Sequence, residues 1–129
     1  LLSRRQRQMC IRDSPWTFQP GHTELGGEKT SSWDYMRTLA LSRLYMDNIA
    51  HIQGSWVTQG ERIGQLTLGF GADDLDGTIG EEKIIHAAGA RTKTGITRTQ
   101  LEKIIREAGY EPVERDTFYR PIGGSEEGV

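Results

Sequence analysis

The stretch HIQGSWVTQGERIGQLTLGFGADDLDGTI, residues 51–79, decides the fold because it has the pattern of two strands joined by a helix. Residues 51–57 alternate in character and finish with aromatic and β-branched side chains, which predicts a strand, and residues 73–79 are predicted to be extended. Between them, Thr58-Gln59-Gly60-Glu61 has the pattern of a capping box, which predicts the start of a helix. Gly71 is suited to end that helix, whose buried face would be Ile63, Leu66, Thr67 and Phe70.

Helices are predicted on both sides of this unit. Upstream, Ser31 or Ser32 can cap a helix over about residues 33–46, with a buried face of Met36, Leu39, Ala40 and Leu44. Downstream, one helix is predicted to begin near Glu81 and to end at Gly89. A second capping box at Thr97 to Gln100 predicts a last helix, ended by Gly109, with a buried stripe of Leu101, Ile104, Ile105 and Ala108.

The remaining segments complete an α/β pattern. Residues 15–20 (PWTFQP) are predicted to be a strand end or an extended loop, residues 110–120 a short extended tail, and residues 123–129 a disordered end. The order is strand then helix, three times, followed by an extra C-terminal helix, which favours parallel crossovers. Because three such units make neither a closed barrel nor a complete doubly wound sheet, we expect a fragment of a larger domain.

Composition narrows the function classes. The 129 residues are 35% hydrophobic and 26% charged with a net charge of −2, and no apolar run is long enough for a membrane span, so we expect a cytoplasmic protein without a membrane partner. One cysteine, Cys10, excludes an internal disulfide framework and a Cys-rich metal site.

Residues 1–14 carry four arginines but resemble translated sequencing adaptor, and we expect this segment to be non-native. The acidic remainder argues against a nucleic-acid partner.

Polar and aromatic side chains gather where the predicted strands end, which is where parallel α/β folds bind ligands. They suit a polar organic ligand with aromatic or heterocyclic parts. The candidate binding residues are Gln19, Trp56, Gln59, Asp74, Asp76 and Thr78. Structural roles stay open for several of them: Trp56 can belong to the core, and Asp74 or Asp76 can be a structural hydrogen-bonding residue. No catalytic residue and no metal site is assigned.

Four stretches resemble a known family: PWTFQPGHTEL (15–25), YMRTLALSRLYMDNIAHIQGSWVTQG (35–60), GQLTLGFGADDLDGTIGEEKIIHAAGA (64–90) and IREAGYEPVERDTFY (105–119). They are similar to the C-terminal third of radical SAM enzymes of the futalosine route to menaquinone. FGADDLDGT, EEKIIHAAGA and PVERDTFY resemble the aminofutalosine synthases, whereas PWTFQP and IQGSWVTQG resemble the cyclic dehypoxanthinyl futalosine synthases. We favour the aminofutalosine synthases, because the Asp-rich strand is expected to lie nearest the ligand.

The resemblance implies a fold, a chemistry and cofactors. Residues 15–122 would be the last strands and helices of a radical SAM (β/α) TIM-like barrel. The enzyme would use S-adenosylmethionine and a [4Fe–4S] cluster held by a CxxxCxxC motif, together with a small-molecule substrate and a cellular electron donor. An aminofutalosine synthase, a C–C bond-forming transferase, adds the 5′-deoxyadenosyl radical to 3-[(1-carboxyvinyl)oxy]benzoate. The motif does not occur in this sequence, so we expect no metal ligand here and no activity from this chain alone.

Two other interpretations stay open. The cyclase of the same pathway would abstract a hydrogen atom from a nucleoside and close a ring. A stand-alone acidic α/β binding module, docking a partner through an open sheet edge, is the alternative from another class of protein. A CxxxCxxC motif about 200–250 residues before Trp16, as expected for the length of a barrel, would distinguish the enzyme from the module.

Overall fold

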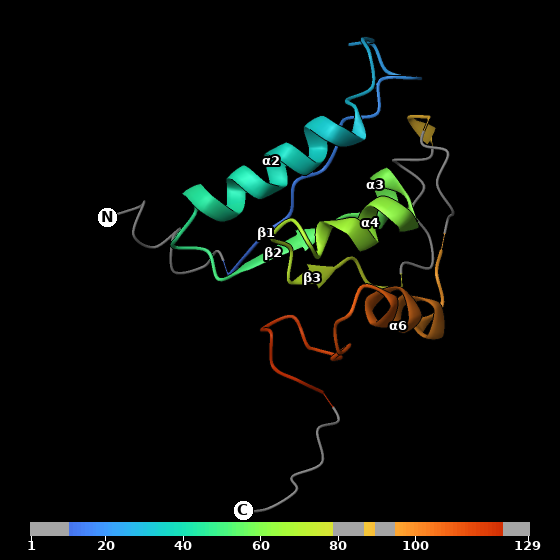
Figure 1. Cartoon of the computed structure of the whole chain (residues 1–129). Helices are drawn as coiled ribbons and strands as arrows, with labels where there is room; N and C mark the ends of the chain where they lie inside the picture. Colours follow the sequence, from blue (N-terminus) through green and yellow to red (C-terminus); the bar gives the residue numbers. More distant parts are fainter. Residues whose placement is uncertain (1–10, 79–86, 90–94, 123–129) are drawn as a thin grey trace, which may run out of the picture.

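The protein is a mixed α/β structure with a small parallel sheet, seen in a computed structural model that describes residues 11–78, 87–89 and 95–122 (Figure 1). Within these residues the sheet has three strands in the order β1-β2-β3, and both neighbouring pairs are parallel. This confirms the predicted α/β class and the parallel pairing. The strands are β1 (Arg12–Asp13), β2 (His51–Gly54) and β3 (Asp74–Leu75), and the helices are α2 (Ser32–Tyr45), α3 (Trp56–Gln59), α4 (Glu61–Thr67) and α6 (Arg98–Glu107).

Helix α2 covers one side of the sheet and forms the larger core with it (Figure 1). The Ser31 hydroxyl accepts a hydrogen bond from the Asp34 backbone N–H, which caps the helix as predicted. The buried side chains of this core are Tyr35, Met36, Leu39, Ile52 and Ala72. The predicted buried face is correct only in the first half of the helix, since Leu44 is 77% exposed. The second half of α2 contributes nothing to this core.

Strand β2 is shorter than predicted, because a helix begins where the strand was expected to continue. It ends at Gly54, and Ser55 caps α3 by accepting a hydrogen bond from the Thr58 N–H. Thr58 is therefore inside a helix, and the predicted capping box from Thr58 to Glu61 is wrong. Gly60, with φ of 90°, separates α3 from α4, and α4 has no side-chain cap.

Helix α4 packs directly on β2 through small side chains. A Cβ at Gly54 would overlap the Thr67 hydroxyl and lie 2.8 Å from the Thr67 Cβ, so the two backbones approach more closely than any other residue allows. Thr67 is fully buried, as predicted, but Leu66 is 52% and Phe70 42% exposed. The predicted face is wrong at these two positions: Phe70 lies beyond the end of the helix at Thr67, and Leu66, inside the helix, is on its exposed side.

Helix α6 has the predicted capping box, with Thr97 and Gln100 satisfying each other's backbone N–H groups. Its Leu101 and Ile104 pack against a second core formed by Trp56, Val57 and Ile96. The helix expected at residues 81–89 lies outside the described residues except for 87–89, and the disordered end expected at 123–129 lies outside them entirely.

Strand β1 lies within the segment that we set aside on sequence. Arg12 and Asp13 pair with His51 and Ile52, so the structure places these two residues in the sheet. The expected loop at residues 15–20 follows this strand without regular secondary structure. The origin of residues 1–14 stays a prediction, and residues 1–10 are outside the described part. None of the helices in the described ranges is long and apolar enough to cross a bilayer.

Candidate functional site at the strand ends

The carboxyl ends of β2 and β3 carry neighbouring polar side chains, because Gln53 and Gly54 pair in register with Asp74 and Leu75. The chain continues from β2 into Ser55 and Trp56, and from β3 into Asp76. The Asp76 N–H donates to the Gly54 carbonyl at 3.2 Å, which extends the pairing by one step. Asp76 therefore lies beside Ser55 at this edge of the sheet.

Asp76 is 4% exposed, and its two carboxylate oxygens have different surroundings. The Ser55 hydroxyl and the Val57 backbone N–H hydrogen-bond to its carboxylate, so Asp76 assists Ser55 in satisfying the start of α3. The second oxygen, Oδ2, is buried and has no hydrogen-bond partner in the described part of the chain. Burial raises the pKa of Asp76, and the nearby Asp74 charge adds to this, against the lowering effect of the two hydrogen bonds.

Trp56 is 1% exposed and belongs to the core, which is the structural role left open above. Its indole Nε1 donates to the Asp76 backbone carbonyl at 2.9 Å, so the ring also fixes the end of β3. Below it, the Ser55 N–H donates to the Tyr35 hydroxyl at 2.8 Å. Burial raises the pKa of Tyr35 to about 12, so its hydroxyl stays neutral.

Gln59 holds the loop of residues 15–20 against the helices, and Gln19 makes a hydrogen bond within that loop. The Gln59 amide donates to the Thr17 hydroxyl and accepts from the Ser32 hydroxyl, which links the loop, α3 and α2. Gln19, 5% exposed, donates to the Thr17 carbonyl at 3.3 Å. Both glutamines are therefore engaged in contacts within the protein.

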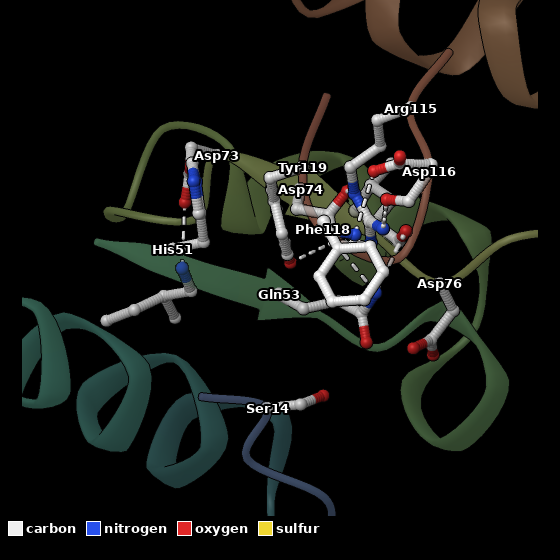
Figure 2. Close-up of polar contacts among 12 residues, drawn as sticks. Ser14, His51, Gln53, Asp73, Asp74, Asp76, Arg115, Asp116, Phe118 and Tyr119 are labelled. Atoms are coloured by element: carbon white, nitrogen blue, oxygen red, sulfur yellow. Dashed lines mark hydrogen bonds and ion pairs between the residues drawn. The ribbon is translucent and has the colours of Figure 1, made fainter. Parts of the chain in front are cut away.

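Asp74, which the sequence placed beside Asp76, is saturated by the C-terminal segment. Its carboxylate accepts from Arg115 through Nε at 2.9 Å and through Nη2, from the Tyr119 hydroxyl at 2.8 Å and from the Gln53 amide at 2.8 Å. The Arg115 guanidinium also lies 4.0 Å from the Tyr119 ring centroid. We call Asp74, Arg115, Tyr119 and His51 the clasp, because Tyr119 stacks on the His51 ring with centroids 3.7 Å apart (Figure 2).

A second carboxylate supports the clasp from the start of the strands. Asp73 lies 2.7 Å from Arg43 Nη2 and 2.5 Å from His51 Nδ1, and accepts from the Ile52 N–H at 2.8 Å. Burial acts to raise the pKa of Asp73, but these hydrogen bonds and the charges of His51 and Arg43 outweigh it and lower that pKa. Sequence reasoning missed the contacts of both carboxylates. For the clasp, the signal available was PVERDTFY (112–119), which carries Arg115 and Tyr119 and was noted only for its resemblance.

A cavity of about 720 Å³, large enough for a small molecule, lies between β3, α6 and the segment that carries Arg115. Gly77 and Thr78 border it, and Thr78 is exposed. A smaller cavity of about 350 Å³ is bordered by Trp56 and Gln59. The predicted site residues are thus divided: Asp74, Trp56, Gln59 and Gln19 have partners within the protein, whereas Asp76 has an unsatisfied oxygen and Thr78 faces open space. Among the described residues, no three His, Cys, Asp or Glu side chains are grouped to hold a metal ion.

This arrangement defines a class: a parallel α/β region whose polar side chains gather at the carboxyl ends of the strands. The chain belongs to the family described as the CofH/MqnC C-terminal region, whose model matches residues 9–127. The resemblance found in the sequence is thereby confirmed.

The similar proteins are enzymes, two of them futalosine synthases and one a transferase. The chain is 44% identical over 113 residues to the aminodeoxyfutalosine synthase of Thermus thermophilus, covering 84% of this chain and 30% of that protein. It is 42% identical over 109 residues to the cyclic dehypoxanthine futalosine synthase of Streptomyces coelicolor, covering 84% and 27%. A 5-amino-6-(D-ribitylamino)uracil–L-tyrosine 4-hydroxyphenyl transferase of Methanococcoides burtonii is 36% identical over 116 residues, covering 84% and 33%. The chain therefore spans about a third or less of the length of these relatives.

Proposed function

We propose that this chain is the C-terminal region of an aminofutalosine synthase, a cytoplasmic radical SAM enzyme of menaquinone biosynthesis. Its small parallel sheet would then be the last part of a (β/α) barrel, with the carboxyl ends of β2 and β3 at the barrel mouth. The proposal rests on two observations together: the chain belongs to this family, and polar side chains lie at the ends of two adjacent parallel strands. The 44% identity to an aminodeoxyfutalosine synthase supports the particular reaction.

In this enzyme the described residues would form one wall of the substrate chamber. Asp76 would accept a hydrogen bond from a polar ligand, and Thr78 would line the open space beside it. Trp56 and Ser55 would hold Asp76 in place and keep water from its carboxylate, which strengthens each hydrogen bond made there. Asp74, Gln59 and Gln19 would act indirectly, by fixing β3 and the loop of residues 15–20.

S-adenosylmethionine, when bound, would supply a carbon radical for addition to the enolpyruvyl double bond, at the cost of one electron from the reduced cluster. The unsatisfied oxygen of Asp76 fits the hydroxyl groups of its ribose. The iron–sulfur cluster does not fit the described residues, which present no group of three metal ligands, so its ligands would come from elsewhere in the enzyme. A small-molecule substrate and a cellular electron donor are the partners that this reaction needs.

The cyclase of the same pathway is the second candidate, supported by the 42% identity over a similar share of the chain. The two reactions differ in product. An aminofutalosine synthase joins the nucleoside radical to a benzoate derivative, whereas the cyclase closes a ring within one nucleoside substrate.

Two measurements test the proposal. The gene is extended upstream, where a CxxxCxxC motif is expected about 200–250 residues before Trp16, from the usual length of a barrel. The complete protein, with its cluster reconstituted and reduced, is then incubated with S-adenosylmethionine and 3-[(1-carboxyvinyl)oxy]benzoate. Aminofutalosine in the product mixture supports the proposal. Turnover of a dehypoxanthinyl nucleoside alone supports the cyclase, and a start codon just before Leu1 supports the acidic binding module.

A further inference from the structure

Two carboxylates at the carboxyl end of the sheet, Asp74 in β3 and Asp76 just after it, differ in their hydrogen bonding. Asp74 lies beside Gln53 and accepts four hydrogen bonds, from Arg115, Tyr119 and Gln53. Asp76, two residues further, hydrogen-bonds to Ser55, and no dashed line joins it to Arg115, Tyr119 or Gln53 in Figure 2. Its Oδ2 has no donor in the described part of the chain, although the side chain is 96% buried. A buried carboxylate oxygen without a donor is rare, because desolvation without a hydrogen bond costs folding free energy.

The neighbouring donors are already committed. The Trp56 indole N–H donates to the Asp76 backbone carbonyl, and the Ser55 hydroxyl hydrogen-bonds to the carboxylate. The Ser55 oxygen in turn accepts from the Thr58 hydroxyl at 3.1 Å and from the Thr58 N–H at 3.3 Å. The Ser55 hydroxyl and the Val57 N–H thus hold the carboxylate, and Trp56 holds the backbone of the same residue, which leaves Oδ2 as an oriented acceptor. Fixed acceptors of this kind bind ligands at little cost in side-chain entropy.

The place of Asp76 points to a ligand as the missing donor. Asp76 directly follows β3, at the edge of the sheet where parallel α/β folds bind ligands. The next residue, Gly77, has no atom within 4 Å of the position where its Cβ would be, and it borders the cavity of about 720 Å³. An ionised carboxylate oxygen accepts and never donates, so the ligand group must carry O–H or N–H.

We propose that Oδ2 of Asp76 accepts a hydrogen bond from a sugar hydroxyl of a nucleoside ligand, and that Asp76 thereby selects ligands that carry this hydroxyl. The choice of a nucleoside rests on the proposed function. The choice of Asp76 over Asp74 rests on the hydrogen bonds alone. Asp76 is then a specificity residue, and Asp74 a structural one.

The test uses the complete enzyme and three probes: 5′-deoxyadenosine and its analogues that lack the 2′- or the 3′-hydroxyl. Affinities are measured by calorimetry for the wild type, Asp76→Asn and Asp74→Asn. Asn at position 76 keeps an oxygen for the Ser55 and Val57 donors and replaces Oδ2 by a donating NH₂. A hydrogen bond to a charged acceptor predicts that removing one particular hydroxyl weakens wild-type binding roughly 10- to 100-fold.

In Asp76→Asn the affinity for 5′-deoxyadenosine should fall by the same factor. Removing that hydroxyl should then weaken binding less than about threefold, because the carboxylate oxygen that accepted its hydrogen bond is gone. Asp74→Asn should keep the wild-type discrimination and lose thermal stability instead. If Asp76→Asn does not fold, Asp76→Glu carries the test, since its added methylene displaces the oxygen.

Wild-type discrimination retained in the Asp76 variants overturns the inference, as does a wild type that binds all three nucleosides equally. If the wild type binds none of them, the proposed function fails as well. Loss of affinity for all three probes by one common factor indicates a structural role for Asp76, and also overturns the inference.

Discussion

Replacing Arg115 by Met should release the C-terminal segment from the sheet. The Arg115 and Asp74 side chains are 21% and 13% exposed, so their two hydrogen bonds are partly shielded from solvent. Charge-assisted bonds of this kind contribute about 1.5–3 kcal/mol. The guanidinium over the Tyr119 ring adds about 0.5–1 kcal/mol. Because Asp74 keeps Tyr119 and Gln53, its charge is not left fully unpaired, and we expect a loss of about 3 kcal/mol.

This magnitude is measured by hydrogen exchange in the complete enzyme. The Ile122 N–H donates to the Glu114 carbonyl at 2.8 Å and the Asp116 N–H to the Arg120 carbonyl at 2.9 Å, so both amides report on opening of this segment. A loss of about 3 kcal/mol corresponds to a roughly 100-fold faster exchange, at about 1.4 kcal/mol for each factor of ten.

The matched control is Arg120→Met in the same segment. Arg120 also forms an ion pair, with Asp116, but its side chain is 72% exposed. Exposed pairs contribute about 0–1 kcal/mol, so exchange should rise less than about fivefold. Equal effects of the two substitutions, or unchanged exchange in Arg115→Met, would refute the assignment of Asp74 as the partner that holds the segment.

Four further outcomes are expected. Gly54→Ala should destabilise the enzyme by about 1–3 kcal/mol because the new Cβ overlaps Thr67, whereas Gly77→Ala, with open space around its Cβ, should lie within about 0.5 kcal/mol of wild type in thermal unfolding. The lowered pKa of Asp73 means that its stabilising contribution is present above the usual carboxyl pKa and is lost as pH falls through the lowered value; a Tm–pH profile that Asp73→Asn leaves unchanged would contradict this. The raised pKa of Asp76 has the opposite effect on stability: the free energy of unfolding should fall as pH rises from the usual carboxyl pKa to the raised one. Asp76→Asn should remove this pH dependence. The 129-residue chain alone should unfold without a single sharp calorimetric transition, because β1 and β3 are edge strands in the described sheet; matching calorimetric and van't Hoff enthalpies from a monomer would show otherwise.

Local signals predicted the elements that local chemistry controls. The capping box at Thr97 and the serine cap at Ser31 each depend on residues three apart in the chain, and both were found where the sequence placed them. The parallel pairing of β2 with β3 followed from the intervening helical segment. The error at the end of β2 has a different cause: Ser55 and Thr58 are both good caps, three residues apart. The Asp76 carboxylate, which follows another strand, hydrogen-bonds to Ser55 and to the Val57 N–H, and the local sequence around Ser55 does not reveal this contact.

The site shows the same limit more clearly. The sequence presented Asp74 and Asp76 as equivalent carboxylates on one strand. Their difference comes from Arg115 and Tyr119, which lie 41 and 45 residues from Asp74 along the chain. No periodicity links positions so far apart. Only the folded arrangement separates the carboxylate that has all its partners from the one that has an oxygen to spare.

The clasp also affects the order in which this region can mature during synthesis. Strands β2 and β3, with α2 and α4, are complete in the nascent chain well before Arg115 and Tyr119 leave the ribosome. Until then Asp74 has its Gln53 contact but no cation, and the exposed edge of β3 is not yet held. A ribosome that stalls within this interval leaves a nascent chain with an open strand edge, and unpaired strand edges make partly folded chains prone to aggregate.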